Sequence, residues 1–199
     1  RAAADGATEA LLVGGGDGTI SAAAAVAYRT GTPLGVLPAG TMNLFARSLA
    51  IPLDLEEAVA GFARGSIRQV DLAAVNGRPF VHQFSLGMHA RMIRLRENMA
   101  FRSRLGKIRA SLAAFLQTFA NPPVAEIRLD LDGREIVRRA SALAVSNNLF
   151  GERQLPYAED PSGGVLGVYI TVARRRADLL KLMLNLLRGR WRMNAQVEN

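Results

Sequence analysis

Residues 14–19 form a glycine-rich stretch whose chemistry suits the binding of phosphate. The stretch consists of Gly14, Gly15, Gly16, Asp17, Gly18 and Thr19. It follows the apolar run Leu11–Val13 and precedes the alanine-rich segment Ile20–Tyr28, which is the order of a strand, a loop and a helix. Glycines allow the backbone to approach an anion closely, and the free amide groups at the start of a helix attract it. The stretch therefore predicts a phosphate-binding loop, in which Thr19 caps the helix or donates its hydroxyl group to phosphate.

Asp17 is the one acidic residue of this loop, and its presence needs an explanation because a carboxylate and a phosphate repel each other. A Mg²⁺ ion that bridges the carboxylate and the phosphate would remove the repulsion. Alternatively, the side chain of Asp17 orients Thr19 and the neighbouring backbone donors. The first role makes Asp17 the expected metal ligand.

A second stretch of the same kind follows about one strand–helix–strand repeat later. Pro33–Leu37 is a short apolar strand candidate, and the segment Pro38–Asn43 leads from it into a predicted helix over Leu44–Leu49. Loops that follow parallel strands meet at the carboxyl edge of the sheet, where such sheets bind ligands. We therefore expect Thr41 and Asn43 to reach the same nucleotide as the first loop.

Together the two stretches resemble the catalytic domain of the diacylglycerol kinase family, which includes sphingosine kinases and soluble bacterial lipid kinases. The resemblance rests on GGDGT at residues 15–19 and on PAGTMNLFAR at residues 38–47. The first motif also occurs in NAD kinases and phosphofructokinases, whereas the second is particular to the lipid kinases. Shorter matches continue at residues 51–54, 70–77 and 80–87.

The resemblance implies a fold, two cofactors and a substrate. The fold is an α/β nucleotide-binding domain with a parallel sheet, truncated here at its N-terminus, followed by a β-sandwich-like second domain, with the active site between them. The cofactors are ATP and Mg²⁺, and the substrate is a hydroxyl group of a diacylglycerol- or sphingoid-like lipid. Residues 14–19, Thr41 and Asn43 would hold the nucleotide.

The rest of the sequence predicts one more helix before the pattern changes to strands. Asp54 and Glu57 form a capping pattern for a helix that runs through Arg64 and stops at Gly65. Asn76-Gly77 and Asp132-Gly133 are typical turns of β-hairpins. The expected strands cover residues 67–75, 80–86, 124–131, 135–145 and 165–172, and further helices cover residues 103–119 and 177–187. The change of pattern predicts a domain boundary near Gly65. Residues 1–65 form the nucleotide-binding domain and residues 66–199 the second domain, both partial relative to the family because the chain opens on Arg1 and stops early.

The catalytic carboxylate is the point at which this sequence departs from the family. The resemblance implies a stretch that reads Pro-Asp-Ala and then Asp-Asp-Gly, and that supplies the base for the lipid hydroxyl. Here Tyr157 stands at the first aspartate position, and Ser162 or Gly163 stands at the position of the Asp-Asp pair. Glu159 or Asp160 supplies the catalytic carboxylate from a shifted loop, or else both are ordinary turn residues. Both interpretations stay open at this stage.

Asp71 and the two histidines are the other titratable residues of interest. Asp71 lies near the cleft and helps to hold Mg²⁺ or the hinge, or is a structural residue at a strand end. His89 occupies a position where the family often has an acidic residue. With His82 and His89 as the only histidines, the sequence does not favour a histidine-based metal site.

Composition narrows the partners and the compartment. The 199 residues include no cysteine, which excludes disulfides and thiolate metal sites and favours a reducing, cytoplasmic compartment. The net charge of +8 is concentrated in two basic clusters, at residues 91–109 and 174–192, the second around a leucine-rich helix with Trp191. Such clusters suit peripheral contact with an anionic membrane surface, or are an ordinary solvated surface. Nucleic acid is not expected, because aromatic residues are few and no binding module is present. Absence of the family's N-terminal strands would leave the parallel sheet with an exposed edge, which favours a homodimer or low solubility.

Three functional hypotheses follow. The first is an ATP- and Mg²⁺-dependent lipid kinase. The second is a nucleotide- or lipid-binding relative that has lost its catalytic carboxylate, which predicts ATP binding without transfer. The third, an NAD kinase, shares the glycine motif but lacks an Asn-Glu pair of the NAD-kinase type.

Overall fold

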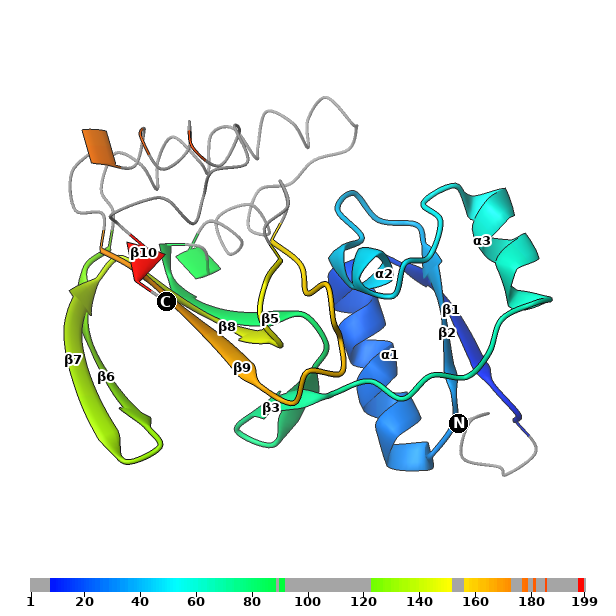
Figure 1. The fold of residues 1–199 in the computed structure, drawn as a ribbon, viewed down its shortest axis with the longest axis horizontal. Helices are drawn as coiled ribbons and strands as arrows, with labels where there is room; N and C mark the ends of the chain where they lie inside the picture. Colours follow the sequence, from blue (N-terminus) through cyan, green and yellow to red (C-terminus); the bar gives the residue numbers. More distant parts are fainter. Residues whose placement is uncertain are drawn as a thin grey trace. The chain divides into compact units, whose positions relative to one another are not determined.

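The computed structural model describes residues 8–88, 90–91, 123–151, 156–172, 177–178, 181, 185 and 197–198 (Figure 1). The chain divides into two compact units. One unit contains residues 1–84 and 146–167, and the other contains residues 85–145 and 168–199.

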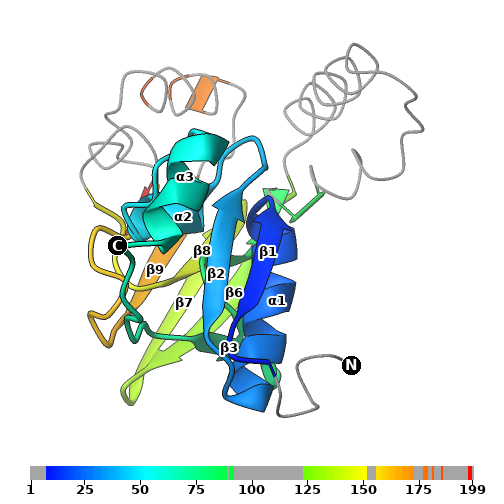
Figure 2. The same ribbon diagram turned by 90° about the vertical axis from the view of Figure 1, so that its right-hand side faces the viewer.

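The first unit is built on a parallel pair of strands joined by a helix. Strands β1 (Leu11–Gly15) and β2 (Leu34–Pro38) pair in register from Leu11 opposite Leu34 to Gly15 opposite Pro38. Helix α1 (Asp17–Thr30) connects them and ends at Gly31, whose φ of 66° is the left-handed conformation that favours glycine. Figure 2 shows the two strands side by side. The predicted α/β start of the chain is therefore present.

Two further helices complete this part of the unit. Helix α2 (Leu44–Ser48) follows β2, and helix α3 (Leu55–Phe62) begins after Asp54, whose carboxylate accepts the amide hydrogens of Glu56 and Glu57 at 3.0 Å each. The predicted cap of α3 is thus confirmed. Helices α1 and α3 cover opposite faces of the β1–β2 pair (Figure 1). The ring of Phe62 reaches β2 at Gly35, where a Cβ atom would lie 3.2 Å from it.

A hairpin and the residues on either side of it join the same core. Strands β3 (Ala73–Val75) and β4 (Arg78–Phe80) are antiparallel around Asn76 and Gly77, whose φ angles of 49° and 73° confirm the predicted turn. Helix α1 packs on β4 as well as on the parallel pair. The hydrophobic core combines residues of the N-terminal elements with residues after Gly65: Ile20, Ala24, Val36, Phe45, Ala46, Val70, Leu72 and Val81.

This core explains why the two units do not divide at Gly65. Residues 70–81 and 146–167 belong to the same unit as the parallel strands, so the change of sequence pattern at Gly65 is not a division between compact units. The backbone amide of Asp71 donates to the carbonyl oxygen of Pro161, and the amide of Asn147 donates to that of His82. The domain assignment as residues 1–65 and 66–199 therefore stays a prediction, and the structure divides the chain elsewhere.

Two predicted strands are shorter than expected, for identifiable reasons. The strand predicted over residues 67–75 begins only at Ala73, because the backbone of residues 69–71 bonds to a loop rather than to a neighbouring strand. The strand predicted over residues 80–86 breaks after Phe80 and resumes as β5 (Gln83–Gly87). At the break, the amide of Val81 donates to the hydroxyl oxygen of Ser21 in α1 at 3.3 Å.

The remaining strands are antiparallel. Strands β6 (Ala125–Leu131) and β7 (Arg134–Ala140) form a hairpin around Asp132 and Gly133, whose positive φ angles confirm the predicted turn. Strands β8 (Ala142–Asn147), β9 (Leu166–Thr171) and β10 (Val197–Glu198) form a sheet with β5 in the order β10-β9-β8-β5. The strand predicted over residues 135–145 is interrupted at Ser141, whose amide and hydroxyl groups both donate to the carbonyl oxygen of Thr171.

The architecture therefore mixes a parallel pair with antiparallel sheets, and the β-sandwich-like arrangement of the second domain stays a prediction. The helix predicted over residues 103–119, His89 and nearly all of both basic clusters lie outside the described residues. Of the helix predicted over residues 177–187, only four residues are described, and all four are helical. Within the described part of the chain, no helix has the length and apolar character needed to cross a membrane.

Candidate functional site

The glycine loop, residues 14–19, runs from the end of β1 into the first turn of α1. Gly14 and Gly15 end the strand, and Gly16 is the residue before the helix. The first bond of the helix is donated by the amide of Ile20 to the carbonyl oxygen of Gly16 at 3.0 Å. The amide groups of Asp17, Gly18 and Thr19 therefore precede the first helical hydrogen bond, which is the arrangement that attracts an anion.

Thr19 does not cap the helix, contrary to one of its two predicted roles. The cap position is Gly16, which has no side chain to offer, and Thr19 lies in the first turn. Its side chain folds back over Gly15, where an added Cβ atom would lie 2.7 Å from the Cβ atom of Thr19 and 3.1 Å from its hydroxyl oxygen. Gly15 is thus required by close packing, and donation of the Thr19 hydroxyl group to phosphate stays a prediction.

The second loop, residues 38–43, touches the glycine loop through backbone atoms. A Cβ atom added to Gly40 would overlap the Cα atom of Gly16 and lie 3.0 Å from its nitrogen. Such an approach requires glycine at position 40, because a side chain there has no space. The structure therefore brings together the two loops that the sequence predicts to share one nucleotide.

Asp17 makes the second connection between the loops. Its Oδ1 atom accepts a hydrogen bond of 3.0 Å from the backbone amide of Phe45, in the first turn of α2. That amide would otherwise be one of the unpaired donors at a helix start, and Asn43, which precedes α2, makes no side-chain cap. Asp17 thus orients neighbouring backbone, which was the alternative to metal binding.

Asn43 is occupied with its own loop. It is buried, in the left-handed conformation with φ of 50°, and its Oδ1 atom accepts the amide hydrogen of Gly40 at 2.8 Å. Its Nδ2 group donates to the carbonyl oxygens of Pro38 and Gly40. These bonds fix the shape of the second loop, and Thr41 is left exposed at its tip. The predicted contacts of Asn43 and Thr41 with nucleotide stay predictions.

A metal at this site would have few protein ligands. Among the residues that the structure describes, no three His, Cys, Asp or Glu side chains gather to hold an ion. Mg²⁺ does not need such a group, since it is commonly held by one or two carboxylates together with phosphate oxygens and water. One oxygen of Asp17 is used by Phe45, so the carboxylate beside the glycine loop fits Mg²⁺ held mainly by the phosphates.

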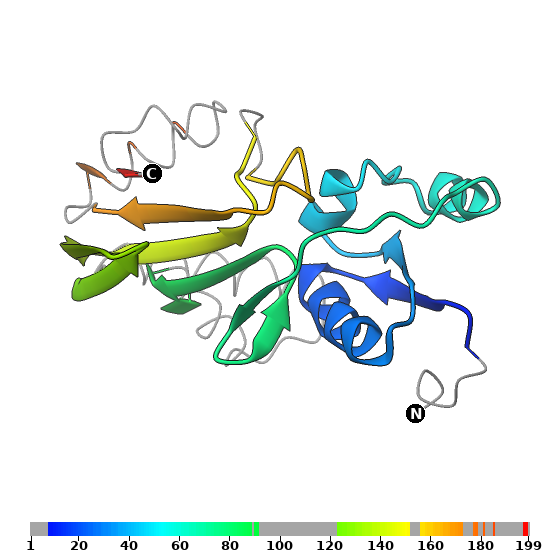
Figure 3. The ribbon, with the colours of Figure 1, turned by 60° about the horizontal axis from the view of Figure 1, so that its bottom comes forward.

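The predicted catalytic carboxylates lie in a loop that passes beside α2 in the ribbon views (Figures 1 and 3). Asp160 is exposed, and its Oδ1 atom accepts a hydrogen bond of 2.9 Å from the backbone amide of Ser162. The same oxygen lies 3.5 Å from the guanidinium group of Arg68, with which it forms an ion pair. Glu159 is exposed and its carboxylate lies against Gly151, where a Cβ atom would be 2.6 Å from its Oε1 atom. The bonds of Asp160 are those of a residue that shapes a turn.

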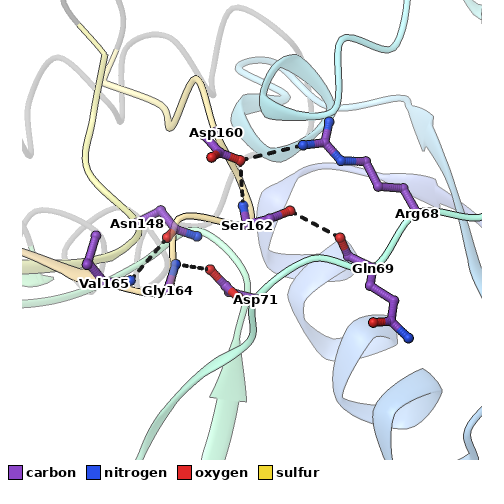
Figure 4. Close-up of polar contacts among 8 residues, drawn as sticks. All are labelled: Arg68, Gln69, Asp71, Asn148, Asp160, Ser162, Gly164 and Val165. Carbon is purple, nitrogen blue, oxygen red and sulfur yellow. Dashed lines mark hydrogen bonds and ion pairs between the residues drawn. The ribbon is translucent and has the colours of Figure 1, made fainter.

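Asp71 anchors this loop, and Figure 4 shows its contact with Gly164. Its Oδ2 atom accepts the amide hydrogen of Gly164 at 2.6 Å, and its amide donates to the carbonyl oxygen of Pro161 at 2.9 Å. Its carbonyl oxygen accepts a bond of 2.7 Å from the side chain of Asn147. Of the two roles predicted for Asp71, the structure shows the structural one.

Asn147 and Asn148 are residues of this region that sequence reasoning did not single out. Asn148 is 1% exposed and has a φ of 70°, a conformation tolerated by Gly and Asn. Its Oδ1 atom accepts from the amide of Val165 at 3.4 Å, whereas its buried Nδ2 group has no hydrogen-bond partner among the described residues. The signal for Asn148 is its residue type, since asparagine adopts this conformation more readily than other residues that carry a side chain.

Comparison with known proteins supports the predicted resemblance to the diacylglycerol kinase family. Residues 1–75 match the sequence model of the diacylglycerol kinase catalytic domain. A Yersinia enterocolitica protein named "Probable lipid kinase YegS-like" is 39% identical over 85 residues, 41% of this chain and 29% of that protein. A diacylglycerol kinase from Staphylococcus saprophyticus is 26% identical over 188 residues, 91% of this chain and 60% of that protein. The chain resembles the diacylglycerol kinase catalytic-domain family in sequence.

The fold agrees with this assignment. The crystal structure of a diacylglycerol kinase from Bacillus anthracis matches with a TM-score of 0.59 at 21% identity, and covers 87% of this chain and 56% of that one. At this identity the match shows the fold alone. The chain spans between 29% and 60% of the length of the two relatives described above.

Proposed function

We propose that this protein is an ATP- and Mg²⁺-dependent lipid kinase that transfers the γ-phosphoryl group to a hydroxyl group of a diacylglycerol- or sphingoid-like lipid. The observation that carries the proposal is the meeting of the two loops, with Gly16 against Gly40 and Asp17 bonded to Phe45. A glycine loop alone occurs in many nucleotide-binding proteins, whereas the second loop carries the motif particular to lipid kinases.

The nucleotide phosphates would lie at the start of α1. The amide groups of Asp17, Gly18 and Thr19 supply fixed donors there, and the helix dipole adds positive potential. The hydroxyl groups of Thr19 and Thr41, both exposed, are further donors for phosphate oxygens. Mg²⁺ held by the phosphates and Asp17 would supply neutralising charge. Because the two loops are locked together, these donors are positioned before the nucleotide binds.

Transfer also needs a carboxylate that accepts the hydroxyl proton of the lipid. The lipid oxygen forms a bond to the γ-phosphorus, the bond from that phosphorus to the bridging oxygen breaks, and ADP leaves with the electron pair. We assign the proton to Asp160, with Glu159 as the second candidate. The Oδ1 atom of Asp160 is held by Ser162, which orients the carboxylate.

A non-catalytic relative is the second candidate function, and a specific observation favours it. The loop has Ser162 or Gly163 at the position where the resemblance implies an Asp-Asp pair, and the bonds of Asp160 are also those of an ordinary turn aspartate. This candidate predicts ATP binding without transfer. An NAD kinase is disfavoured by the second loop and by the match of residues 1–75 to the diacylglycerol kinase catalytic domain.

Transfer of labelled phosphate from ATP distinguishes these candidates. The protein is assayed with Mg²⁺ in mixed micelles that contain diacylglycerol, sphingosine, phosphatidylglycerol or no lipid. Lipid-dependent transfer that is lost in Asp160→Asn, and kept in Glu159→Gln, supports the proposal as stated. ATP binding with no transfer to any lipid supports the non-catalytic relative instead.

Three other expectations extend the proposal. Peripheral contact with an anionic membrane rests on the basic clusters, which lie almost entirely outside the described residues. A cytoplasmic location and a homodimer rest on the sequence arguments alone. Sedimentation with vesicles that contain phosphatidylglycerol, and the mass of the protein in solution, test the first and the last of these.

A further inference from the structure

We propose that Asp71 is a positioning residue, on which the placement of the 160–164 loop, and with it phosphoryl transfer, depends. The inference rests on the proposed function for its second half only. Its first half concerns a set of hydrogen bonds that is measured without any activity.

Four contacts attach the 160–164 loop to the 68–71 segment. Two of them end on backbone atoms of that segment, and a third ends on the carboxylate of Asp71. The amide of Asp71 donates to Pro161, and its carboxylate accepts from Gly164. The hydroxyl group of Ser162 donates to the carbonyl oxygen of Gln69 at 3.1 Å. The fourth contact is the ion pair between Arg68 and Asp160 (Figure 4).

These contacts differ in strength. The bond from Gly164 to the Asp71 carboxylate is 2.6 Å long, and hydrogen bonds to an ionised acceptor are among the stronger ones in proteins. The Arg68–Asp160 contact measures 3.5 Å between side chains that are 60% and 66% exposed, and such pairs contribute little. Asp71 is therefore the side chain of the 68–71 segment that holds the loop.

The anchor is itself fixed to the hydrophobic core. The neighbours of Asp71 in the chain, Val70 and Leu72, pack against the cluster that contains Ile20 and Phe45. Ile20 lies in α1 and Phe45 in α2, the helices that begin at the glycine loop and after the second loop. Asp71 thus joins the loop that carries Asp160 to the elements that carry the proposed phosphate site.

The role follows from what the loop lacks. The one carboxylate of the 160–164 loop, that of Asp160, is exposed, and Gly163 and Gly164 add backbone freedom. Without the bond to Asp71, the amide of Gly164 would lose its acceptor, and Asp160 would sample more orientations. Phosphoryl transfer depends on positioning, so a displaced carboxylate lowers the rate of transfer.

The test compares Asp71→Ala, Asp71→Asn and the matched control Arg68→Ala, which removes the exposed contact to the same loop. Amide hydrogen exchange of Gly164 reports the bond directly, and kcat and KM for ATP report the function. In Asp71→Ala we expect exchange at Gly164 to rise about tenfold or more and kcat to fall about tenfold, with KM for ATP within about twofold of the unchanged protein. Asp71→Asn, whose amide oxygen still accepts a bond, should restore part of the protection.

Unchanged exchange at Gly164 in Asp71→Ala would overturn the inference, as would an equal rise of exchange at Gly164 in Arg68→Ala. A parallel loss of ATP affinity in Asp71→Ala and Asp71→Asn would show general destabilisation and would also overturn it. If the protein without substitutions transfers no phosphate, the proposed function is contradicted, but the inference about Asp71 is not. In that case the exchange of Gly164 still decides whether Asp71 places the loop.

Discussion

The region that we propose to bind phosphate, called the phosphate region below, contrasts with the 160–164 loop. It consists of the glycine loop, the second loop and the starts of α1 and α2. In the phosphate region the residues expected from the family stand at their positions, and their backbones pack directly against each other. In the 160–164 loop the expected carboxylates are replaced, and the loop is held from outside by Asp71. The first region is thus specified by steric fit, and the second by a few polar contacts.

This difference teaches where sequence change is tolerated. The contact between Gly16 and Gly40 is lost when one carbon atom is added to Gly40. Position 40 must therefore stay glycine for the two loops to keep their contact. A loop attached by hydrogen bonds to backbone groups keeps its place when its own side chains change. Replacement of side chains in the 160–164 loop is therefore compatible with a loop that keeps its place.

The largest effect that separates the two regions is expected from Gly40→Ala. The added methyl group would overlap the backbone of Gly16, so we expect a loss of stability of roughly 3 kcal/mol and at least a tenfold loss of ATP affinity. Gly61→Ala in α3 is the matched control, because an added Cβ atom meets nothing within 4 Å there. Thermal unfolding and calorimetric titration with ATP measure both. Equal stability of the two variants would contradict the steric account.

Next in size is the effect of changing Asp17. Asp17→Asn keeps an acceptor for the amide of Phe45 but loses the charge, so the fold should persist while Mg²⁺-dependent nucleotide binding is lost. Asp17→Ala also loses the acceptor, so its free energy of unfolding should be lower than that of Asp17→Asn by about 1 kcal/mol. Titration with ATP, with and without EDTA, separates the two roles. If Asp17→Asn binds ATP with unchanged, Mg²⁺-sensitive affinity, Asp17 is not the metal ligand.

A cap remote from both regions provides a scale for stability alone. Asp54→Ala removes the acceptor of two amide hydrogens at the start of α3, which should cost about 1 kcal/mol. ATP affinity should not change, because α3 contributes no residue to either loop. Chemical denaturation measures the first quantity and titration the second. A fall in ATP affinity would mean that the phosphate region responds to general stability, and not only to its own contacts.

The smallest effect is expected from Arg68→Ala. Its contact with Asp160 is long and exposed, so the free energy of unfolding should change by less than about 0.5 kcal/mol. A larger change in denaturation experiments would show that the 160–164 loop is held by charge pairing, and would remove the distinction drawn between Arg68 and Asp71.

The phosphate region could be predicted from sequence because its signals are local. Strand β1, helix α1, strand β2 and the capped helix α3 all follow from adjacent residues, and so do the turns at Asn76-Gly77 and Asp132-Gly133. The bond from Phe45 to Asp17 spans 28 residues but joins two recognisable motifs, so its two ends were already singled out.

The anchoring of the 160–164 loop could not be predicted, because its bonds join residues 93 positions apart and end largely on backbone atoms. Backbone groups carry no sequence signature. For the same reason the strand predicted over residues 67–75 was too long: an apolar, extended segment looks like a strand whether its partner is another strand or a loop. The cap role of Thr19 was wrong because the helix begins earlier, at Asp17.

The central claim is that the glycine loop and the second loop form one phosphate site. It is tested most directly by following backbone amide resonances while ATP and Mg²⁺ are added. The account predicts that the amides of Gly16, Asp17, Gly18 and Thr19 shift together with those of Gly40 and Thr41, with one common dissociation constant. Shifts confined to one loop, or to neither, would contradict the claim.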